Sequence, residues 1–440
     1  MVDQDILVLG GGPAGAVTAI ALQQLGYRVT LVTEPRPFAA VEGISARVWQ
    51  ALRQAGLISA LAQVQPPSPR RVCWNGVDSH INEERLVERR RFDSALLEDL
   101  RAWGVTVVEG RVEHNVPDAA RPWARVCTVN GVQTLSAAFM VEARGRAAPA
   151  AGTRRLHGPA TLAIVQRWYG PARRACSAVG SLDIGWGWMA ALPSGERYVQ
   201  LMVDSQHTCL PAKEQLGEWS LQHLRRLPYA DLFLEQARPL PGINARISTP
   251  VLQQELVGTS WIRIGDAAMA VDPLSGNGIF QSLSSALQAP AVINTLLQRP
   301  SDRALAIAFY QRRVEELFLR FARIGRDFCR QEQRWSDQAF WQSRARWPDE
   351  QPVHDMARRL PAITVCPVVD QYFIRNARVV TTADHPQGIW HLNGVELAPL
   401  LDELLLVTDA GIDPQLLWSQ LLQMARQASR STEAVGFQQA

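Results

Sequence analysis

The 440-residue sequence predicts an α/β fold, α+β overall, with more than one domain. Three observations support this prediction. An apolar run at 6–9 leads into a glycine turn and an apolar helix, a second strand-and-glycine pattern follows at 261–278, and between them lies a pair of strand-like segments at 185–204. The first two patterns are typical of parallel strands followed by helices, and the third of an antiparallel sheet.

The composition is that of a globular protein with filled cores. Hydrophobic residues make up 47%, charged residues 20%, and the net charge is +3, which excludes a disordered chain and does not suggest a nucleic-acid-binding protein. No apolar run reaches the roughly 18 residues that span a bilayer, and the N-terminus does not resemble a secretory signal, so we expect a cytoplasmic protein. The six cysteines show no C-x-x-C spacing, and we interpret them as reduced thiols with no metal site.

The N-terminal stretch "DILVLGGGPAGAVTAIALQQLGYRVTLVTE" predicts a strand, a tight turn, a helix and a second strand. Its glycines fit G-x-G-x-x-G, which permits a tight turn, close approach of backbone to a pyrophosphate, and close packing of helix on strand. The helix N-terminus directs N–H groups at the phosphates, and an acid about 20 residues later is placed to bind a ribose. The predicted cofactor contacts here are Gly10, Gly12, Pro13, Ala14, Gly15 and Glu34.

The second pattern is "GDAAMAVDPLSGNGIFQSLSSA" at 265–286. The strand "WIRIGD" ends there, and Asp272 is expected to be extended because proline disfavours helical geometry in the residue before it. Gly276, Asn277 and Gly278 precede a helix through the 280s. Backbone N–H groups and a helix N-terminus then point at an electron-rich group.

Together the two patterns resemble those of the aromatic-ring hydroxylase and tryptophan halogenase superfamily of FAD-dependent monooxygenases. The resemblance implies a Rossmann-like FAD-binding domain of the glutathione reductase type. It implies that Asp266 reaches the ribityl chain and that Pro273 lies beside the reactive face of the flavin. It also implies that the segment Gly276, Asn277 and Gly278 faces the pyrimidine edge.

Further stretches extend the resemblance. Arg47 in "EGISARVWQALRQAGL" is implied to approach the FAD phosphates, and Arg89 in "VERRRFDSALLEDL" matches an arginine of the same family. A solvated helix face is the alternative for Arg47. In "FMVEARGRAA", Glu142 and Gly145 replace a common D-A-D-G, which leaves the roles of the neighbouring arginines open.

The FAD-binding domain is expected to be discontinuous, over 1–70, 86–150 and 250–330. Residues 71–85 and 155–249 are expected to form a substrate-facing β-sheet domain, and 331–440 a C-terminal helical region. The order of elements in that region is compatible with a small winged-helix-like module, with a plain structural cap as the alternative. Trp186 and Trp188 alternate on one strand and so share a face, which makes them candidates for a substrate pocket, with ordinary core packing an equal alternative. The arginines of "QSRARW" are expected near the rim of that pocket.

The resemblance implies a reaction that uses FAD, O2 and either NAD(P)H or a separate flavin reductase. A flavin C4a-hydroperoxide would hydroxylate an electron-rich aromatic ring, with the protein supplying orientation and dryness. Halogenases place a lysine between flavin and substrate, but "PRRVCWNGVDSH" has none, and Lys213, the only lysine, lies elsewhere, which disfavours halogenation. No catalytic base is identified, since none of the eight histidines has a recognisable partner.

Among family members without that lysine, the sequence most resembles the flavoproteins of cysteine tryptophylquinone maturation, including those of quinohemoprotein amine dehydrogenase biogenesis. The implied substrate is a tryptophan within a peptide or protein. A small-molecule aromatic hydroxylase and a geranylgeranyl-reductase-like FAD oxidoreductase remain alternatives. A flavin-bound scaffold without turnover is a third.

Overall fold

A computed structural model describes residues 4–149, 155–275, 278–354, 359–408 and 411–436. The chain forms two compact units. The first unit comprises residues 1–293 and 310–350, and the second comprises 294–309 and 351–440. The second unit is therefore assembled from two separate stretches, and residues 331–350 belong to the first.

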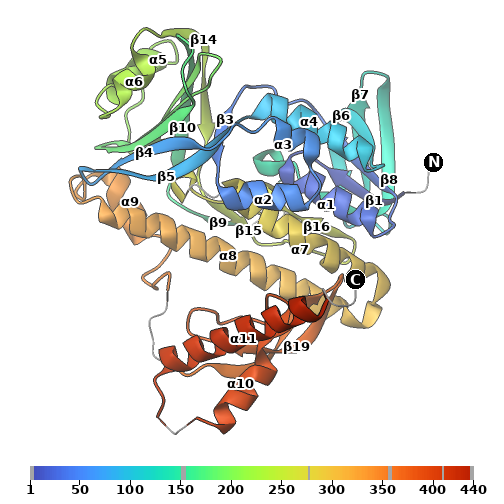
Figure 1. Cartoon of the computed structure of the whole chain (residues 1–440). Coiled ribbons are helices and arrows are strands. Elements are labelled where there is room, and N and C mark those ends of the chain that lie inside the picture. Colours follow the sequence, from blue (N-terminus) through green and yellow to red (C-terminus); the bar gives the residue numbers. More distant parts are fainter. Residues whose placement is uncertain (1–3, 150–154, 276–277, 355–358, 409–410, 437–440) are drawn as a thin grey trace. The chain divides into compact units, whose positions relative to one another are not determined.

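A parallel sheet in the order β6-β2-β1-β8-β16 forms the N-terminal part of the first unit (Figure 1). A further strand, β7, pairs antiparallel with extensions of both β6 and β8. Ile6, Leu7, Val8 and Leu9 are all fully buried, as expected for a parallel strand covered on both faces. The six strands are β1 (Gln4–Leu9), β2 (Val29–Thr33), β6 (Thr106–Val116), β7 (Trp123–Thr128), β8 (Gly131–Glu142) and β16 (Trp261–Arg263).

Two helices of the first unit, α2 and α4, begin at side chains that accept hydrogen bonds from free backbone N–H groups. The Ser45 hydroxyl accepts a hydrogen bond from the Val48 N–H at the start of α2, and the Glu88 carboxylate accepts from the first turn of α4. Phe92, Leu96 and Leu100 form the buried face of α4. The helices are α1 (Pro13–Gln24), α2 (Ala46–Gln54), α3 (Ile58–Ala62), α4 (Arg89–Ala102) and α9 (Ala339–Arg346), with α7 (Gly278–Gln298) and α8 (Arg303–Gln331) extending into the second unit.

A large, mostly antiparallel sheet follows the order β14-β10-β13-β12-β11-β4-β5-β3. A turn at Pro193-Ser194-Gly195 joins β12 to β13, the two strand-like segments predicted at 185–204, with Gly195 at φ 96°. The strands are β3 (Val41–Ile44), β4 (Ser68–Trp74), β5 (Val77–Glu88), β10 (Thr161–Tyr169), β11 (Cys176–Leu182), β12 (Gly185–Ala191), β13 (Glu196–Asp204) and β14 (Arg238–Ile247).

The two faces of this sheet have different roles because side chains alternate along each strand. Val199, Leu201 and Val203 of β13 pack in a core with α5 (Leu216–Leu224) and α6 (Ala230–Leu234). Their neighbours Tyr198 and Gln200 point to the opposite face, which lines a cavity. A small sheet of β9 (Arg155–His157), β15 (Val251–Gln253) and β17 (Met269–Ala270) lies elsewhere in the unit.

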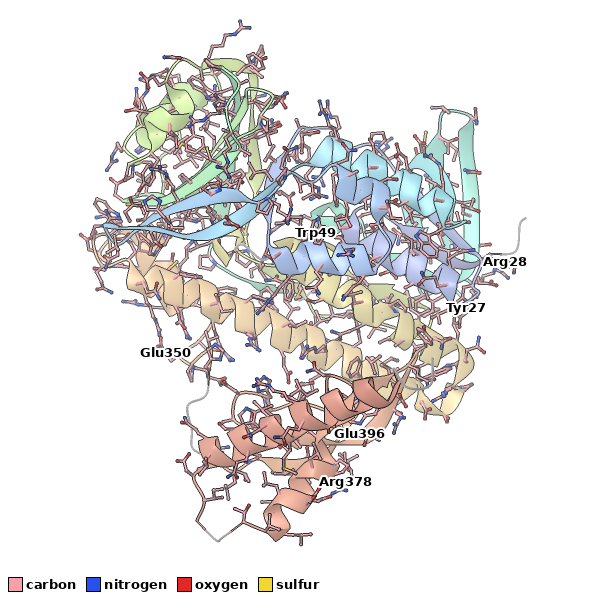
Figure 2. All side chains as sticks on the ribbon, in the orientation of Figure 1. Tyr27, Arg28, Trp49, Glu350, Arg378 and Glu396 are labelled. Atoms are coloured by element: carbon pink, nitrogen blue, oxygen red, sulfur yellow. The ribbon has the colours of Figure 1, made fainter. Side chains whose placement is uncertain are left out.

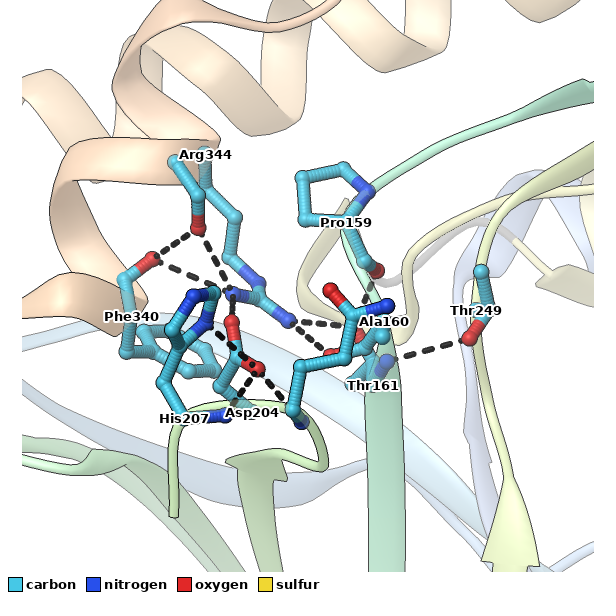
Figure 3. Close-up of polar contacts among 10 residues, drawn as sticks. Pro159, Ala160, Thr161, Asp204, His207, Thr249, Phe340 and Arg344 are labelled. Carbon is cyan, nitrogen blue, oxygen red and sulfur yellow. Dashed lines mark hydrogen bonds and ion pairs between the residues drawn. The ribbon is translucent and has the colours of Figure 1, made fainter.

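A buried arginine of α9 fixes the ends of two strands of the large sheet (Figure 3). The Arg344 guanidinium donates to Asp204 Oδ2 at 3.1 Å, to Thr161 Oγ1 at 2.6 Å and to the Ala160 carbonyl at 2.9 Å. Burial by itself would raise the pKa of Asp204, but backbone N–H groups and Arg344 outweigh it, and the net pKa is lowered. Placing this arginine at a pocket rim was therefore wrong, since its side chain is 5% exposed.

The second unit is a hairpin followed by two helices around its own core. Val380, Leu397, Leu401, Leu417 and Leu421 are fully buried in that core. At the surface, Arg378 of the hairpin donates to the Asp402 carboxylate of the first helix at 2.8 Å (Figure 2). The elements are β18 (Ala362–Asp370), β19 (Phe373–Thr381), β20 (His391–Leu392), β21 (Val395–Glu396), α10 (Leu397–Leu406) and α11 (Pro414–Gly436).

Across the ranges that the structure describes, no helix combines the length and the apolar character needed to cross a lipid bilayer.

Candidate functional site

A cavity of about 320 Å³ lies in the first unit. One wall is the inner face of the large sheet, with side chains from β4, β5 and β10 to β14. Other walls come from residues 38–43 and from the stretch that carries the second glycine pattern, including Asp266, Pro273 and Gly278. The cavity therefore joins sequence segments that are far apart in the chain.

The first glycine motif separates into residues that the fold requires and one that faces open space. Gly10 has φ 116°, and a Cβ there would lie 2.3 Å from the Ala143 carbonyl oxygen. A Cβ on Gly15 would lie 2.0 Å from the Gly10 carbonyl oxygen. A Cβ on Gly12, the N-cap of α1, meets no atom within 4 Å. This open position beside a helix N-terminus fits the diphosphate of FAD.

The other residues predicted to contact the ADP half of FAD differ in their exposure. Pro13 is the first residue of α1, and the Ala14 Cβ lies 3.0 Å from where a Cβ on Gly265 would stand. Glu34 follows β2 and Arg47 lies on α2, and both are exposed. Their contacts with FAD stay predictions.

Arg89 is buried and fully engaged with carboxylates. Its Nη1 donates to Glu42 Oε1 at 2.6 Å, and its Nε and Nη2 donate to Asp93 Oδ1 at 3.1 and 2.9 Å. The pKa of Arg89 is raised, because these two carboxylates outweigh the loss of solvent. In this structure Arg89 therefore positions Glu42 at the cavity wall, and direct contact with FAD stays a prediction.

The second glycine motif presents the partly exposed carboxylate of Asp266 to the cavity. Asp266 Oδ1 accepts from the Ser282 hydroxyl at 3.0 Å, and Oδ2 lies 3.7 Å from Arg146 Nε. Burial raises the pKa of Asp266, and Arg146 opposes this shift. Pro273 and Gly278 line the same cavity, and a Cβ on Gly278 would meet no atom within 4 Å. Gly276 and Asn277 lie outside the described residues.

The two arginines whose roles the sequence left open are structural anchors. Arg144 donates to Glu142 Oε1 at 2.9 Å and to Asn115 Oδ1 at 2.7 Å, which compensates a carboxylate buried at the end of β8. Arg146 donates to the carbonyls of Thr249, at 2.6 Å, and Val271, at 3.2 Å. Arg146 is thereby fixed at the cavity wall facing Asp266.

Trp186 and Trp188 both line the cavity from β12, as their alternation implied. Trp186 is 3% exposed and packs in a cluster with Phe340 and Trp341 of α9. Trp188 packs against that cluster and against the one that contains Tyr198. Both tryptophans therefore serve the core and the cavity wall at once.

Sequence reasoning missed a polar group on the same sheet face. Glu84 of β5 is 9% exposed, accepts a hydrogen bond from the Ser177 hydroxyl, and has Oε2 4.0 Å from Arg70 Nε. All but Ser177 line the cavity. The available signal was an acidic residue at an inward position of an alternating strand, which is expensive to bury without a purpose.

The chain is similar to several known proteins. A family model described as lycopene cyclase protein matches residues 5–175. A tryptophan 2-halogenase from Chondromyces crocatus is 28% identical over 386 residues, covering 80% of this chain and 73% of that protein. The solved structure of the peptidyl tryptophan dihydroxylase QhpG, essential for tryptophylquinone cofactor biogenesis, is 48% identical. It covers 97% of this chain and 98% of that chain, with a TM-score of 0.82.

The chain belongs to the halogenase-like family of FAD-dependent monooxygenases. The halogenase CmlS has the same fold, with a TM-score of 0.76 at 16% identity over 99% of this chain. Membership confirms the predicted fold class and the prediction of an FAD-dependent enzyme.

The lysine on which halogenases of the family depend has no counterpart in this cavity. Lys213 lies between β13 and α5, is exposed, and is not among the residues that line the cavity. The stretch "PRRVCW" forms β4, and the cation it contributes to the cavity wall is Arg70. Among the described residues that line the cavity, none is a lysine.

Proposed function

We propose that the chain is an FAD-dependent monooxygenase that hydroxylates a tryptophan ring of a peptide or protein during quinone cofactor biogenesis. The observation that carries this proposal is the 48% identity with a peptidyl tryptophan dihydroxylase, spread over nearly the full length of both chains. The match covers 97% of this chain, and the residues that line the cavity are spread over positions 38 to 279. The absence of a cavity lysine among the described residues supports hydroxylation over halogenation.

The residues of this chain fit the requirements of such a reaction. The first glycine motif would hold the diphosphate of FAD, while Asp266, Pro273 and Gly278 would border its flavin end. When bound and reduced, FAD supplies an electrophilic oxygen derived from O2. One oxygen atom enters a ring C–H bond, the other leaves as water, and two electrons come from NAD(P)H, directly or through a flavin reductase.

The cavity residues orient the ring and keep water away from it. Ala163, Val179 and Leu274 provide apolar surface, and Trp186 and Trp188 provide aromatic surface against which a ring can pack. Asp266 lies at the wall fixed by Arg146 and Ser282. Such a lining is suited to holding an electron-rich ring in one orientation beside the cofactor.

The test is to incubate the FAD-loaded protein with a tryptophan-containing peptide, NADH, a flavin reductase and isotopically labelled O2. We expect the tryptophan to gain oxygen from O2, as measured by mass spectrometry, with the same yield in the presence and absence of chloride or bromide. Free tryptophan turned over as fast as the peptide would support a small-molecule hydroxylase instead. A halogenated product would overturn the proposal.

A further inference from the structure

Glu84 lies in a setting built around a carboxylate. Across the sheet face, Glu84 of β5, Arg70 of β4 and Ser177 of β11 stand on three adjacent strands. The Ser177 hydroxyl donates to Glu84 Oε1. On the next strand, β3, a Cβ at Gly43 would lie 2.0 Å from Glu84 Oε2, so the glycine leaves room for the carboxylate in this position.

This carboxylate keeps hydrogen-bonding capacity for a ligand. The Arg70 Nε atom lies 4.0 Å from Oε2, beyond hydrogen-bonding distance, so the two attract without using up the oxygen's lone pairs. Arg70 Nε is itself buried without a hydrogen-bond partner among the described residues. Buried polar groups are normally satisfied, and these two border a cavity into which a ligand can bring the missing partner.

The position of Glu84 relative to Trp188 defines a place for a ring. Trp188 is on β12 and Glu84 on β5, and the strands β11 and β4 lie between them. Val179 of β11 lines the cavity in that interval and offers an apolar floor. A flat ring lying over Val179 would have aromatic surface on one side and a carboxylate oxygen at its opposite edge.

From this arrangement we propose that Glu84 accepts a hydrogen bond from the ring N–H of the substrate indole. This inference rests on the proposed function. It assigns a partner to the ring N–H, the group by which an indole differs from a ring that has no hydrogen-bond donor. As oxygen adds to the ring, positive charge spreads onto the ring nitrogen, and its hydrogen bond to the Glu84 side chain strengthens. Glu84 is thus assigned both recognition of the ring and stabilisation of that developing charge.

The test combines a protein variant with a substrate variant. Glu84→Gln keeps the size of the side chain, and a peptide whose tryptophan is replaced by its benzothiophene analogue keeps the shape of the ring without the N–H. If the two groups bond to each other, Glu84→Gln lowers kcat/KM for the indole peptide by about 10- to 100-fold and leaves that of the analogue nearly unchanged. Equal losses with both peptides, or no loss with either, would overturn the proposal.

Glu83→Gln is the matched control, because Glu83 is the neighbouring acid on β5 and is exposed on the other face of the sheet. It should retain the wild-type preference for the indole peptide. If Glu84→Gln does not fold, the wild-type enzyme still decides the matter. It should bind the indole peptide more tightly than the analogue, a comparison that the intrinsic reactivity of the two rings does not affect, and absence of this preference would count against the role of Glu84.

A separate measurement distinguishes failure of this inference from failure of the proposed function. If the wild-type protein modifies no peptide, the proposed function fails. Binding of free indole and of benzothiophene to the FAD-loaded protein can still be followed through the flavin absorbance. Tighter binding of indole that disappears in Glu84→Gln supports the subsite, and equal binding of both rings overturns it.

Discussion

At the scale of single residues, the three glycines of the first motif are needed for different reasons, two for the fold and one for the predicted ligand. Gly10 and Gly15 have backbone carbonyl oxygens where a Cβ would stand, so the protein itself requires glycine there. Gly12 has extended backbone angles, φ −72° and ψ 179°, and open space around its missing Cβ. No protein atom fills that space, and we expect the FAD diphosphate to lie there.

Gly12→Leu should therefore abolish FAD binding without destabilising the apoprotein. The side chain occupies the position of the diphosphate, but clashes with no protein atom near its Cβ. We expect loss of flavin absorbance in the purified protein and an unchanged melting temperature of the apoprotein. The contrasting control is Gly15→Ala, which should destabilise the fold itself by about 1–3 kcal/mol. Full flavin content in Gly12→Leu would show that the diphosphate lies elsewhere.

The thermal stability of the apoprotein should depend on pH through the titration of Asp266. Because burial raises its pKa, the folded apoprotein binds this proton more tightly than the unfolded chain, and stability is lost as the pH rises through the raised pKa. Asp266→Asn removes the charge and retains a partner for Ser282. The variant apoprotein should unfold at a higher temperature than wild type near neutral pH, and the difference should vanish below the ordinary pKa of 3.8.

Thermal unfolding across the acidic and neutral range measures this effect. A difference in melting temperature that is the same at every pH would mean that Asp266→Asn acts through packing. Flavin content provides a second readout, and we expect it to fall, since Asp266 borders the predicted flavin end of the cavity.

At the scale of elements, a buried ion pair is one of the contacts that attach α9 to the large sheet. Asp204 and Arg344 have side chains 2% and 5% exposed, and Arg344 also binds the start of β10. The same helix carries Phe340 and Trp341, which pack behind Trp186 in the cavity wall. The position of this helix therefore controls one wall of the site.

Arg344→Met should lower the free energy of unfolding by about 3–5 kcal/mol, because it leaves the Asp204 carboxylate buried without its cation. Chemical denaturation measures the loss. The control is Arg346→Met on the same helix, where the exposed arginine should cost no more than about 0.5 kcal/mol. Equal stabilities of the two variants would show that the Asp204 ion pair contributes little.

At the scale of the whole molecule, the second unit is built from a short stretch at 294–309 and the chain beyond 350. The two stretches are held by hydrogen bonds. Asn294 donates to the Tyr372 carbonyl at 2.8 Å, and the fully buried Thr295 hydroxyl accepts from the Ile374 N–H at 2.8 Å. Removing the later stretch therefore uncovers buried groups of the earlier one.

A chain that ends before Pro352 should keep FAD but melt at a lower temperature. All cavity-lining residues belong to the first unit, so FAD should stay bound. Asn294 and Thr295 lose their hydrogen bonds to Tyr372 and Ile374, so stability should fall. If the second unit helps to hold a polypeptide substrate, oxygenation of the peptide should also be lost. Thr295→Val in the full chain separates the two effects, since it should lower stability and keep peptide turnover. Full-rate peptide turnover by the truncated chain would exclude a role of the second unit in substrate binding.

Local sequence patterns were sufficient to predict the features that depend only on neighbouring residues. The strand at Ile6–Leu9, the glycine turn, the Pro193-Ser194-Gly195 hairpin and the shared face of Trp186 and Trp188 all follow from backbone geometry over a few residues. The family resemblance rested on the same short motifs. These features are local, so they can be read without knowing what packs against them.

Only the tertiary structure decided how distant charged groups are used. Glu84 meets Ser177 across 93 residues, and Arg344 meets Asp204 across 140. A periodic pattern shows which side of a strand or helix turns inward, but it does not show which other element supplies the partner. The sequence by itself determined an FAD-dependent fold with two glycine motifs and an aromatic strand face. Long-range packing decided that Glu84 enters the cavity and that Arg344 leaves solvent, because burying each charge depends on a partner that only the folded chain provides.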